Sequence, residues 1–161
     1  MPVRQVREFL DSNNIKFVAV THSTAYTAQE IAALTHTKGK DLSKTVIVRL
    51  DGKLAMGVVP ASTHVDLRLL KECSGAKTIG LATEAEFRSS FPGCETGAMP
   101  PFGNLYDMRV FIDDSLTRKE EIVFNAGTHN ELMRLSYADY ERLVAPEVVR
   151  FLAERAGAHA A

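Results

Sequence analysis

The segment that most constrains the fold is a β-hairpin at residues 43–59. It reads "SKTVIVRL", then "DG", then "KLAMGVV". β-Branched and aliphatic residues favour extended strands, and Asp-Gly between two such runs is a strong signal for a tight turn. The two strands of a hairpin must pair antiparallel, which argues against a purely parallel, doubly wound sheet.

Short strands and helices fill the rest of the chain. Further strands are predicted in "KFVAV", "AKTIGLA", "MRVFIDD", "EIVFNAG" and "HNELMRLS", the last two paired across the turn "NAGTH". Helices are predicted at residues 3–13, from the capping box "TAQE" at 27–30, in "VDLRLLKEC", from the capping box "TEAE" at 83–86, after Ser136, and in "EVVRFLAERAG" with Pro146 in its first turn. We therefore expect one α/β domain over residues 1–161, with a mixed, largely antiparallel sheet and helices around it.

Composition places the chain among globular proteins. It has 161 residues, of which 45% are hydrophobic and 24% charged, enough apolar material for a real core. No apolar run approaches the length of a membrane span, and the N-terminal segment lacks a signal-peptide core, so we expect a cytoplasmic protein with no membrane partner. Cys73 and Cys94 lie in no CxxC motif and are expected to be reduced thiols.

The distribution of charge is uneven. The net charge is −1, which does not favour DNA as a partner. Residues 38–77 carry eight basic and four acidic residues, whereas residues 78–161 carry eight basic and thirteen acidic ones. The first of these segments either meets a phosphate-bearing partner or is a solvated charged surface.

Catalytic motifs of the familiar enzyme classes are missing. The chain has no GxSxG, HExxH, Walker or GxGxxG sequence, no metal-ligand spacing, and five scattered histidines. One lysine has a suggestive position, because Lys44 opens the strand at 43–50 and follows Lys38 and Lys40. Binding residues concentrate at the ends of such elements.

Two loops add to this picture. The first, "GAMPPFGN" at residues 97–104, has two glycines and two adjacent prolines, so it is stiff and presents its remaining N–H groups in fixed directions. Fixed N–H groups suit a carbonyl substrate or an oxyanion. The second loop is "NAGTH" at 125–129, where His129 projects from the turn and can titrate near neutral pH.

Taken in order, the motifs "KTVIV" (Lys44, Thr45), "GAMPP" (Gly97, Pro101) and "NAGTH" (Gly127, His129) resemble those of the prolyl-tRNA editing domains. This family is also called the YbaK/aminoacyl-tRNA synthetase-associated domain. The resemblance covers nearly the whole chain, to about residue 144. It implies a barrel-like mixed sheet surrounded by helices.

The resemblance also implies an activity, hydrolysis of the ester between a wrong amino acid and the terminal ribose of a tRNA. Such an ester is already activated, so a positioned water and donors for the oxyanion suffice, without a cofactor or metal. The expected partners are the acceptor end of a mischarged tRNA, such as alanyl- or cysteinyl-tRNA for proline, and an aminoacyl-tRNA synthetase. The presence of His129 resembles the alanine-removing branch.

Residue roles follow from the same resemblance. Lys44, Gly97 and His129 are the expected catalytic residues. The "GAMPPFGN" loop is expected to form a wall of the aminoacyl pocket, with Met99 or Phe102 limiting side-chain size. The expected substrate-binding residues are His22, Tyr26, Thr45, Ala98, Met99, Pro101, Phe102, Gly103, Asn125, Gly127 and Thr128.

Two other classes of function stay open on the sequence. In the first, the same pocket holds an aminoacyl-adenosine or a small ligand without turnover. In the second, the chain is an interaction domain that docks a protein or RNA through the basic segment 38–77, and Lys44 matters no more than Lys53.

Overall fold

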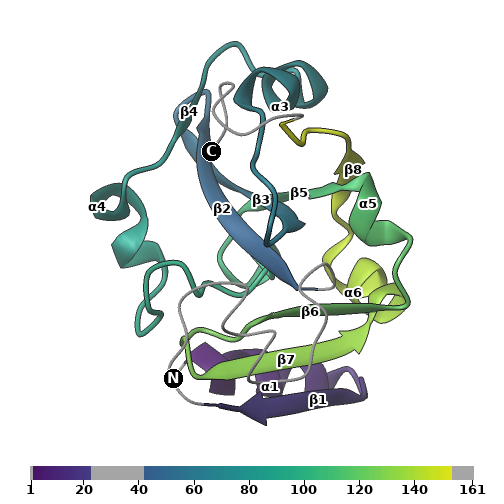
Figure 1. The fold of residues 1–161 in the computed structure, drawn as a ribbon. Helices are drawn as coiled ribbons and strands as arrows, with labels where there is room; N and C mark the ends of the chain where they lie inside the picture. Colours follow the sequence, from purple (N-terminus) through teal and green to yellow (C-terminus); the bar gives the residue numbers. More distant parts are fainter. Residues whose placement is uncertain (1, 23–41, 154–161) are drawn as a thin grey trace.

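Two β-sheets form the framework of the chain, which is seen in a computed structural model and described for residues 2–22 and 42–153 (Figure 1). One sheet has the strand order β1-β7-β6 and the other β4-β2-β3-β5-β8. The helices and strands are α1 (Pro2–Ser12), β1 (Phe17–Thr21), β2 (Ser43–Leu50), β3 (Lys53–Pro60), α3 (Leu67–Ser74), β4 (Ile79–Leu81), α4 (Glu84–Phe87), β5 (Arg109–Asp113), α5 (Asp114–Thr117), β6 (Glu121–Asn125), β7 (Glu131–Ser136), α6 (Tyr137–Val144) and β8 (Glu147–Val149).

The larger sheet is built on the predicted hairpin. β2 and β3 pair antiparallel from Ser43↔Pro60 to Leu50↔Lys53, and both turn residues, Asp51 and Gly52, have positive φ. Positive φ at both central positions is the geometry that matches the twist of the strands. β4 adds antiparallel to β2, while β5 and β8 add in parallel on the other side.

The smaller sheet is antiparallel throughout and lies below the larger one in Figure 1. The two sheets meet where β2 begins beside β6. Leu42 forms an isolated parallel bridge with Val123, and the Ser43 hydroxyl donates to the Val123 carbonyl at 2.7 Å. The sheets are thus joined at one seam instead of closing into a complete barrel.

The main core lies between the sheets and the helices. Its largest buried side chains include Phe102, which makes edge-to-face contacts with Phe9, Phe124 and Tyr140 at centroid distances of 5.4–6.1 Å. Edge-to-face packing of this kind adds to the stabilisation from apolar burial. A second cluster, centred on Phe111 and Phe151, covers the other face of the larger sheet.

Most predicted elements are confirmed, and so is the fold class. Four of the six strand pairings among the described residues are antiparallel, as expected for a mixed, largely antiparallel fold. Thr83 forms the predicted capping box with Glu86, and Ser136 caps α6. Cys73 and Cys94 are both free thiols. No helix in the described part of the chain is long and apolar enough to span a membrane.

One predicted helix is wrong, and another lies outside the described residues. The segment after Pro146 forms β8 instead of a helix, because Glu147–Val149 pairs in parallel with β5. This pairing carries the chain to Phe151, which is fully buried in the second cluster. The capping box at 27–30 and the helix expected to follow it fall within the undescribed segment 23–41.

We predict that the Tyr140 hydroxyl stabilises the loop "GAMPPFGN" at residues 97–104, which we call the proline loop. It is buried and donates to the Pro101 carbonyl at 2.6 Å, so Tyr140→Phe should lower the free energy of unfolding by about 1–2 kcal/mol. Denaturant unfolding measures this change. Tyr137→Phe is the matched control, since the buried Tyr137 hydroxyl has no hydrogen-bond partner among the described residues and its removal should be neutral or stabilising. Equal losses in both variants would contradict the prediction.

Candidate active site

The loop at residues 94–98 and the turn at residues 125–129 are joined by their backbones. The Glu95 N–H donates to the Gly127 carbonyl and the Gly127 N–H donates to the Ala98 carbonyl, both at 2.8 Å. Gly127 has φ +100° and Gly97 has φ +85°, a region that side chains disfavour. The two predicted motifs therefore form one structural unit, and each contributes a glycine that the geometry requires.

His129 reinforces this unit from the turn. Its side chain is buried, 8% exposed, and Nε2 lies 2.9 Å from the Thr96 carbonyl oxygen and 3.9 Å from Oε2 of Glu95. A carbonyl only accepts, so Nε2 carries the proton and donates. This nitrogen therefore positions the residue before Gly97 and is not available as a base in this arrangement.

Gly97 is exposed at the start of the proline loop, whose residues 98–103 are buried. A Cβ at this position would lie 3.6 Å from Cε1 of His129, which is ordinary contact, so the positive φ and not lack of space requires glycine. The N–H of Ala98 already donates to the Glu95 carbonyl at 3.0 Å, whereas none of the hydrogen bonds among the described residues uses the N–H of Gly97. The Gly97 N–H is thus a candidate donor to a bound ligand.

Lys44 lies near the start of β2, opposite Val59 on β3. Its side chain is half-buried, and within the described residues its ammonium makes no hydrogen bond or ion pair. Burial lowers the pKa of Lys44 below the ordinary value of 10.5. A half-buried charge without a partner costs stability, which is typical of groups that bind a ligand.

Asn125 follows on the same face at the end of β6. Leu42 and Val123 are bridged in parallel, and because side chains alternate along strands, Lys44 and Asn125 come next on that face two residues later. The Oδ1 atom of Asn125 is buried and has no hydrogen-bond partner in the described residues. The seam between the sheets thus holds a donor and an acceptor that no described residue uses.

The remaining predicted site residues divide between the turn and the core. The His22 N–H donates to the Asn130 carbonyl at 2.8 Å, which places His22 beside the turn, and the Thr128 hydroxyl accepts from the Asn130 N–H at 3.3 Å. Tyr26 lies outside the described residues. Thr45 faces the main core, opposite Val58.

The proline-rich half of the loop is buried in the core. Pro101, Phe102 and Gly103 are buried, and a Cβ on Gly103 would lie 2.4 Å from the Met108 carbonyl oxygen, so no other residue fits there. Met99 is 5% exposed and packs in the same cluster. A role for Met99 or Phe102 in setting pocket size stays a prediction.

The structure adds three residues to this unit that the motifs did not indicate. Glu95 and Thr96 supply backbone groups that hold the turn and His129, and Asn130 pairs with His22 through backbone and side chain. Glu95 and Thr96 directly precede the predicted loop, so adjacency was the only signal in the sequence. Asn130 directly follows the predicted turn, so adjacency was its only signal as well, and its pairing with the distant His22 could not be read from the sequence.

Cys94 precedes the same loop but is unsuited to nucleophilic attack. Its thiol lies 3.9 Å from the Tyr106 hydroxyl, and burial raises the pKa of Cys94 above the ordinary value. The thiol therefore stays protonated near neutral pH. In residues 2–22 and 42–153, no three His, Cys, Asp or Glu side chains are grouped so as to hold a metal ion.

The matched family and the fold agree on the class of this protein. Residues 22–143 match the aminoacyl-tRNA editing domain, and the chain belongs to that family. This match includes Lys44, the proline loop and the turn with His129. The predicted enzyme class, an aminoacyl-tRNA deacylase, is therefore confirmed at the level of the family.

Individual relatives carry related descriptions. The chain is 29% identical over 147 residues to the multifunctional Ser/Thr-tRNA deacylase ProXp-y of Escherichia coli K12, covering 88% of this chain and 87% of that protein. A putative trans-editing enzyme for prolyl-tRNA synthetase shares its fold, with a TM-score of 0.80, 22% identity, and 94% and 97% of the two chains covered. A hypothetical protein superposes with a TM-score of 0.83 at 20% identity, covering 92% and 99%.

We predict that Lys44→Met stabilises the protein while removing the charge from the site. The gain should be about 0.5 kcal/mol or less, since the ammonium is half-exposed to water. A charged lysine with a lowered pKa destabilises the fold below that pKa, so the gain should shrink as pH rises towards 10.5.

Thermal unfolding between pH 7 and pH 10.5 measures this effect, with Lys53→Met at the exposed turn of the hairpin as the control. A loss of stability in Lys44→Met would show that the ammonium has a stabilising partner.

Proposed function

We propose that this chain is a free-standing deacylase, acting in trans as a single domain, that releases a small amino acid from a mischarged tRNA. The observation that carries the proposal is the exposed Gly97 in a chain of the aminoacyl-tRNA editing family. The loop–turn unit holds this glycine, and none of the described residues accepts from its N–H. The aminoacyl-tRNA is the substrate, and an aminoacyl-tRNA synthetase that makes the mischarged product is the proposed partner.

The chemistry needs little beyond position and hydrogen bonds. A water attacks the ester carbonyl carbon, and the carbonyl oxygen becomes an oxyanion. As this intermediate collapses, the bond to the ribose oxygen breaks and one proton of the water passes to that oxygen, which releases the amino acid and the ribose hydroxyl. The Gly97 N–H donates to the oxyanion, where a fixed donor acts mainly on the transition state. The other hydroxyl of the terminal ribose, which is not esterified, helps to place the water.

Lys44 and His129 have different roles in this scheme. The Lys44 ammonium binds the terminal phosphate or the adenosine, which gives its half-buried charge a partner. His129 is a positioning residue, because its Nε2 proton is held by the Thr96 carbonyl and fixes the direction of Gly97. Neither residue attacks the ester.

The choice of amino acid depends on Asn125 in this proposal. Its buried Oδ1 can accept from a substrate hydroxyl, which favours seryl and threonyl esters over alanyl and cysteinyl ones. The description of the Escherichia coli relative as a Ser/Thr-tRNA deacylase supports the same preference. Alanyl- and cysteinyl-tRNA for proline are the competing substrates.

We predict that Gly97→Ala lowers turnover more than binding. Alanine at φ +85° turns or strains the peptide that carries the donor, and loss of one oxyanion donor typically costs about 2.7–4 kcal/mol, a hundred- to a thousandfold in rate. Single-turnover deacylation and binding of a non-hydrolysable aminoacyl-adenosine analogue separate the two effects.

Gly52→Ala is the control for positive φ alone, because Gly52 has φ +83° in the distant hairpin turn. If Gly97→Ala reacts at the wild-type rate, Gly97 is not the oxyanion donor. If the wild-type protein binds the analogue and protects the ester from hydrolysis, the chain is a binding module.

We also predict that Asn125→Leu changes selectivity. The substitution keeps the size of the side chain and removes the acceptor, so kcat/KM for seryl and threonyl esters should fall about tenfold or more. The alanyl ester should stay within about twofold of the wild-type value. Equal losses for seryl and alanyl esters would assign Asn125 to the fold and not to amino-acid choice.

A further inference from the structure

Three parallel strands of the larger sheet end at one edge. β3 pairs in parallel with β5, and β5 with β8, so the segments after Pro60, Asp113 and Val149 leave the sheet side by side. Ligands commonly bind at the carboxyl ends of parallel strands, because the segments that follow converge there.

Two adjoining hollows lie at this edge, with volumes of about 340 and about 470 Å³. They share Ser115, Arg118 and Leu152, so they form one groove. The residues that line the groove are Pro60, Ser62, Thr63, Leu69, Asp113, Asp114, Ser115, Arg118, Lys119, Arg150 and Leu152.

The charged side chains of the groove suit an anion. Arg118, Lys119 and Arg150 line it against two carboxylates, Asp113 and Asp114. Asp114 pairs with Arg118 at 2.5 Å and with Arg150 at 3.5 Å, so the two guanidinium groups converge on one point. The Arg118 and Arg150 side chains are 68% and 82% exposed, and the donors not directed at Asp114 can bind a phosphate.

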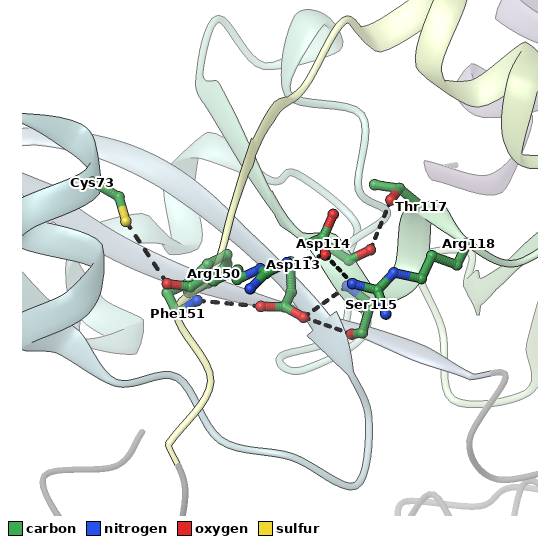
Figure 2. A network of polar contacts seen from close by, with 8 residues as sticks. All are labelled: Cys73, Asp113, Asp114, Ser115, Thr117, Arg118, Arg150 and Phe151. Atoms are coloured by element: carbon green, nitrogen blue, oxygen red, sulfur yellow. Dashed lines mark hydrogen bonds and ion pairs between the residues drawn. The ribbon is translucent and has the colours of Figure 1, made fainter.

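Asp113 fixes the two sides of the groove to each other. Its Oδ2 accepts from the N–H and the hydroxyl of Ser115, and its Oδ1 accepts from the Phe151 N–H at 3.2 Å. Figure 2 shows these contacts linking α5 to the segment after β8, with Arg118 and Arg150 carried on the two linked segments. The buried carboxylate is thus fully engaged inside the protein and holds both arginines on rigid backbone.

The groove and Lys44 lie at the same end of the sheet. β2 is antiparallel to β3, so the start of β2 is level with the end of β3, and Lys44 pairs with Val59 just before the groove begins at Pro60. The Ala61 N–H donates to the Leu42 carbonyl at 2.8 Å, which ties this part of the groove to the seam.

We infer that this groove binds backbone phosphates of the tRNA acceptor end, through Arg118 and Arg150. The inference rests on the proposed function, because the terminal aminoacyl ester must lie at the seam for the nucleotides that precede it in the tRNA strand to reach the groove. Contacts of this kind add affinity without reading sequence, and their strength falls with salt.

The test compares two ligands and two variants. Arg118→Ala/Arg150→Ala should raise Kd for uncharged tRNA about tenfold at low salt, and flatten the slope of log Kd against log salt by about 1.4–1.8. The same variant should hydrolyse an aminoacyl-adenosine within about twofold of the wild-type rate, because this substrate has no phosphates. Arg4→Ala, which removes an exposed arginine with an i,i+4 partner on α1, should change neither value.

Asp114→Asn provides a test in the opposite direction. It removes the acidic charge between the two arginines, so uncharged tRNA should bind about two- to fivefold more tightly, with a steeper salt slope. A purely structural role for the cluster predicts no gain in affinity. The variant Arg118→Lys/Arg150→Lys keeps both positive charges and should retain most of the affinity for uncharged tRNA.

Each outcome decides between the claims. If the double-alanine variant binds tRNA as tightly as the wild type, or if it hydrolyses aminoacyl-adenosine with an equally large loss, the groove does not bind tRNA phosphates. The proposed deacylase activity is not affected by either result. If the wild-type protein deacylates nothing, the proposed function fails, but binding of uncharged tRNA still shows whether the groove takes phosphates.

Discussion

Two reciprocal backbone hydrogen bonds between the loop at 94–98 and the turn at 125–129 hold the candidate active site together. They connect segments that are distant in the chain, and they place the exposed Gly97 against the buried His129. The Tyr140 hydroxyl, which donates to Pro101, and the aromatic packing of Phe102 anchor the segment that follows this loop in the core. The direction of the Gly97 N–H is therefore set by packing on one side and by hydrogen bonds on the other, as a preorganised donor requires.

The seam between the two sheets gives this site its polar groups. At the start of β2 the two sheets touch through Leu42 and Val123. The next residues on that face, Lys44 and Asn125, have polar atoms that no residue of 2–22 or 42–153 uses. A fold selected only for stability would pair or replace both groups. Their cost is consistent with a site in which the substrate supplies the missing partners, and in our proposal the groove at the same edge extends this site towards the tRNA strand.

Local sequence signals predicted the elements whose conformation is decided locally. The Asp51-Gly52 turn and the caps at Thr83 and Ser136 are confirmed, because each depends on residues within a few positions. The helix predicted after Pro146 was wrong because the conformation of this segment is decided by a distant partner. Its apolar spacing suits a helix, but pairing with the distant β5 decides its conformation, and the exposed Val148 shows that helical burial is not what organises it.

The motifs of the candidate site can be read from the sequence, but the contacts between them cannot. Lys44, Gly97 and His129 were indicated by residue type and order, whereas the Thr96 carbonyl that holds His129 depends on a contact between distant segments. The same holds for the apolar residues of the proline loop. An apolar residue such as Phe102 suits either a pocket wall or a core. Only the structure shows that it packs against Phe124 and Tyr140.

The measurement that tests the account most directly is single-turnover deacylation by the wild-type protein of a panel of aminoacyl-tRNAs. The panel contains seryl-, threonyl-, alanyl- and cysteinyl-tRNA, with correctly charged prolyl-tRNA for comparison. The account predicts release of at least one small amino acid at a rate far above spontaneous hydrolysis, with seryl or threonyl esters fastest and prolyl-tRNA spared. Esters that all survive at or below the spontaneous rate in the presence of bound protein would contradict it.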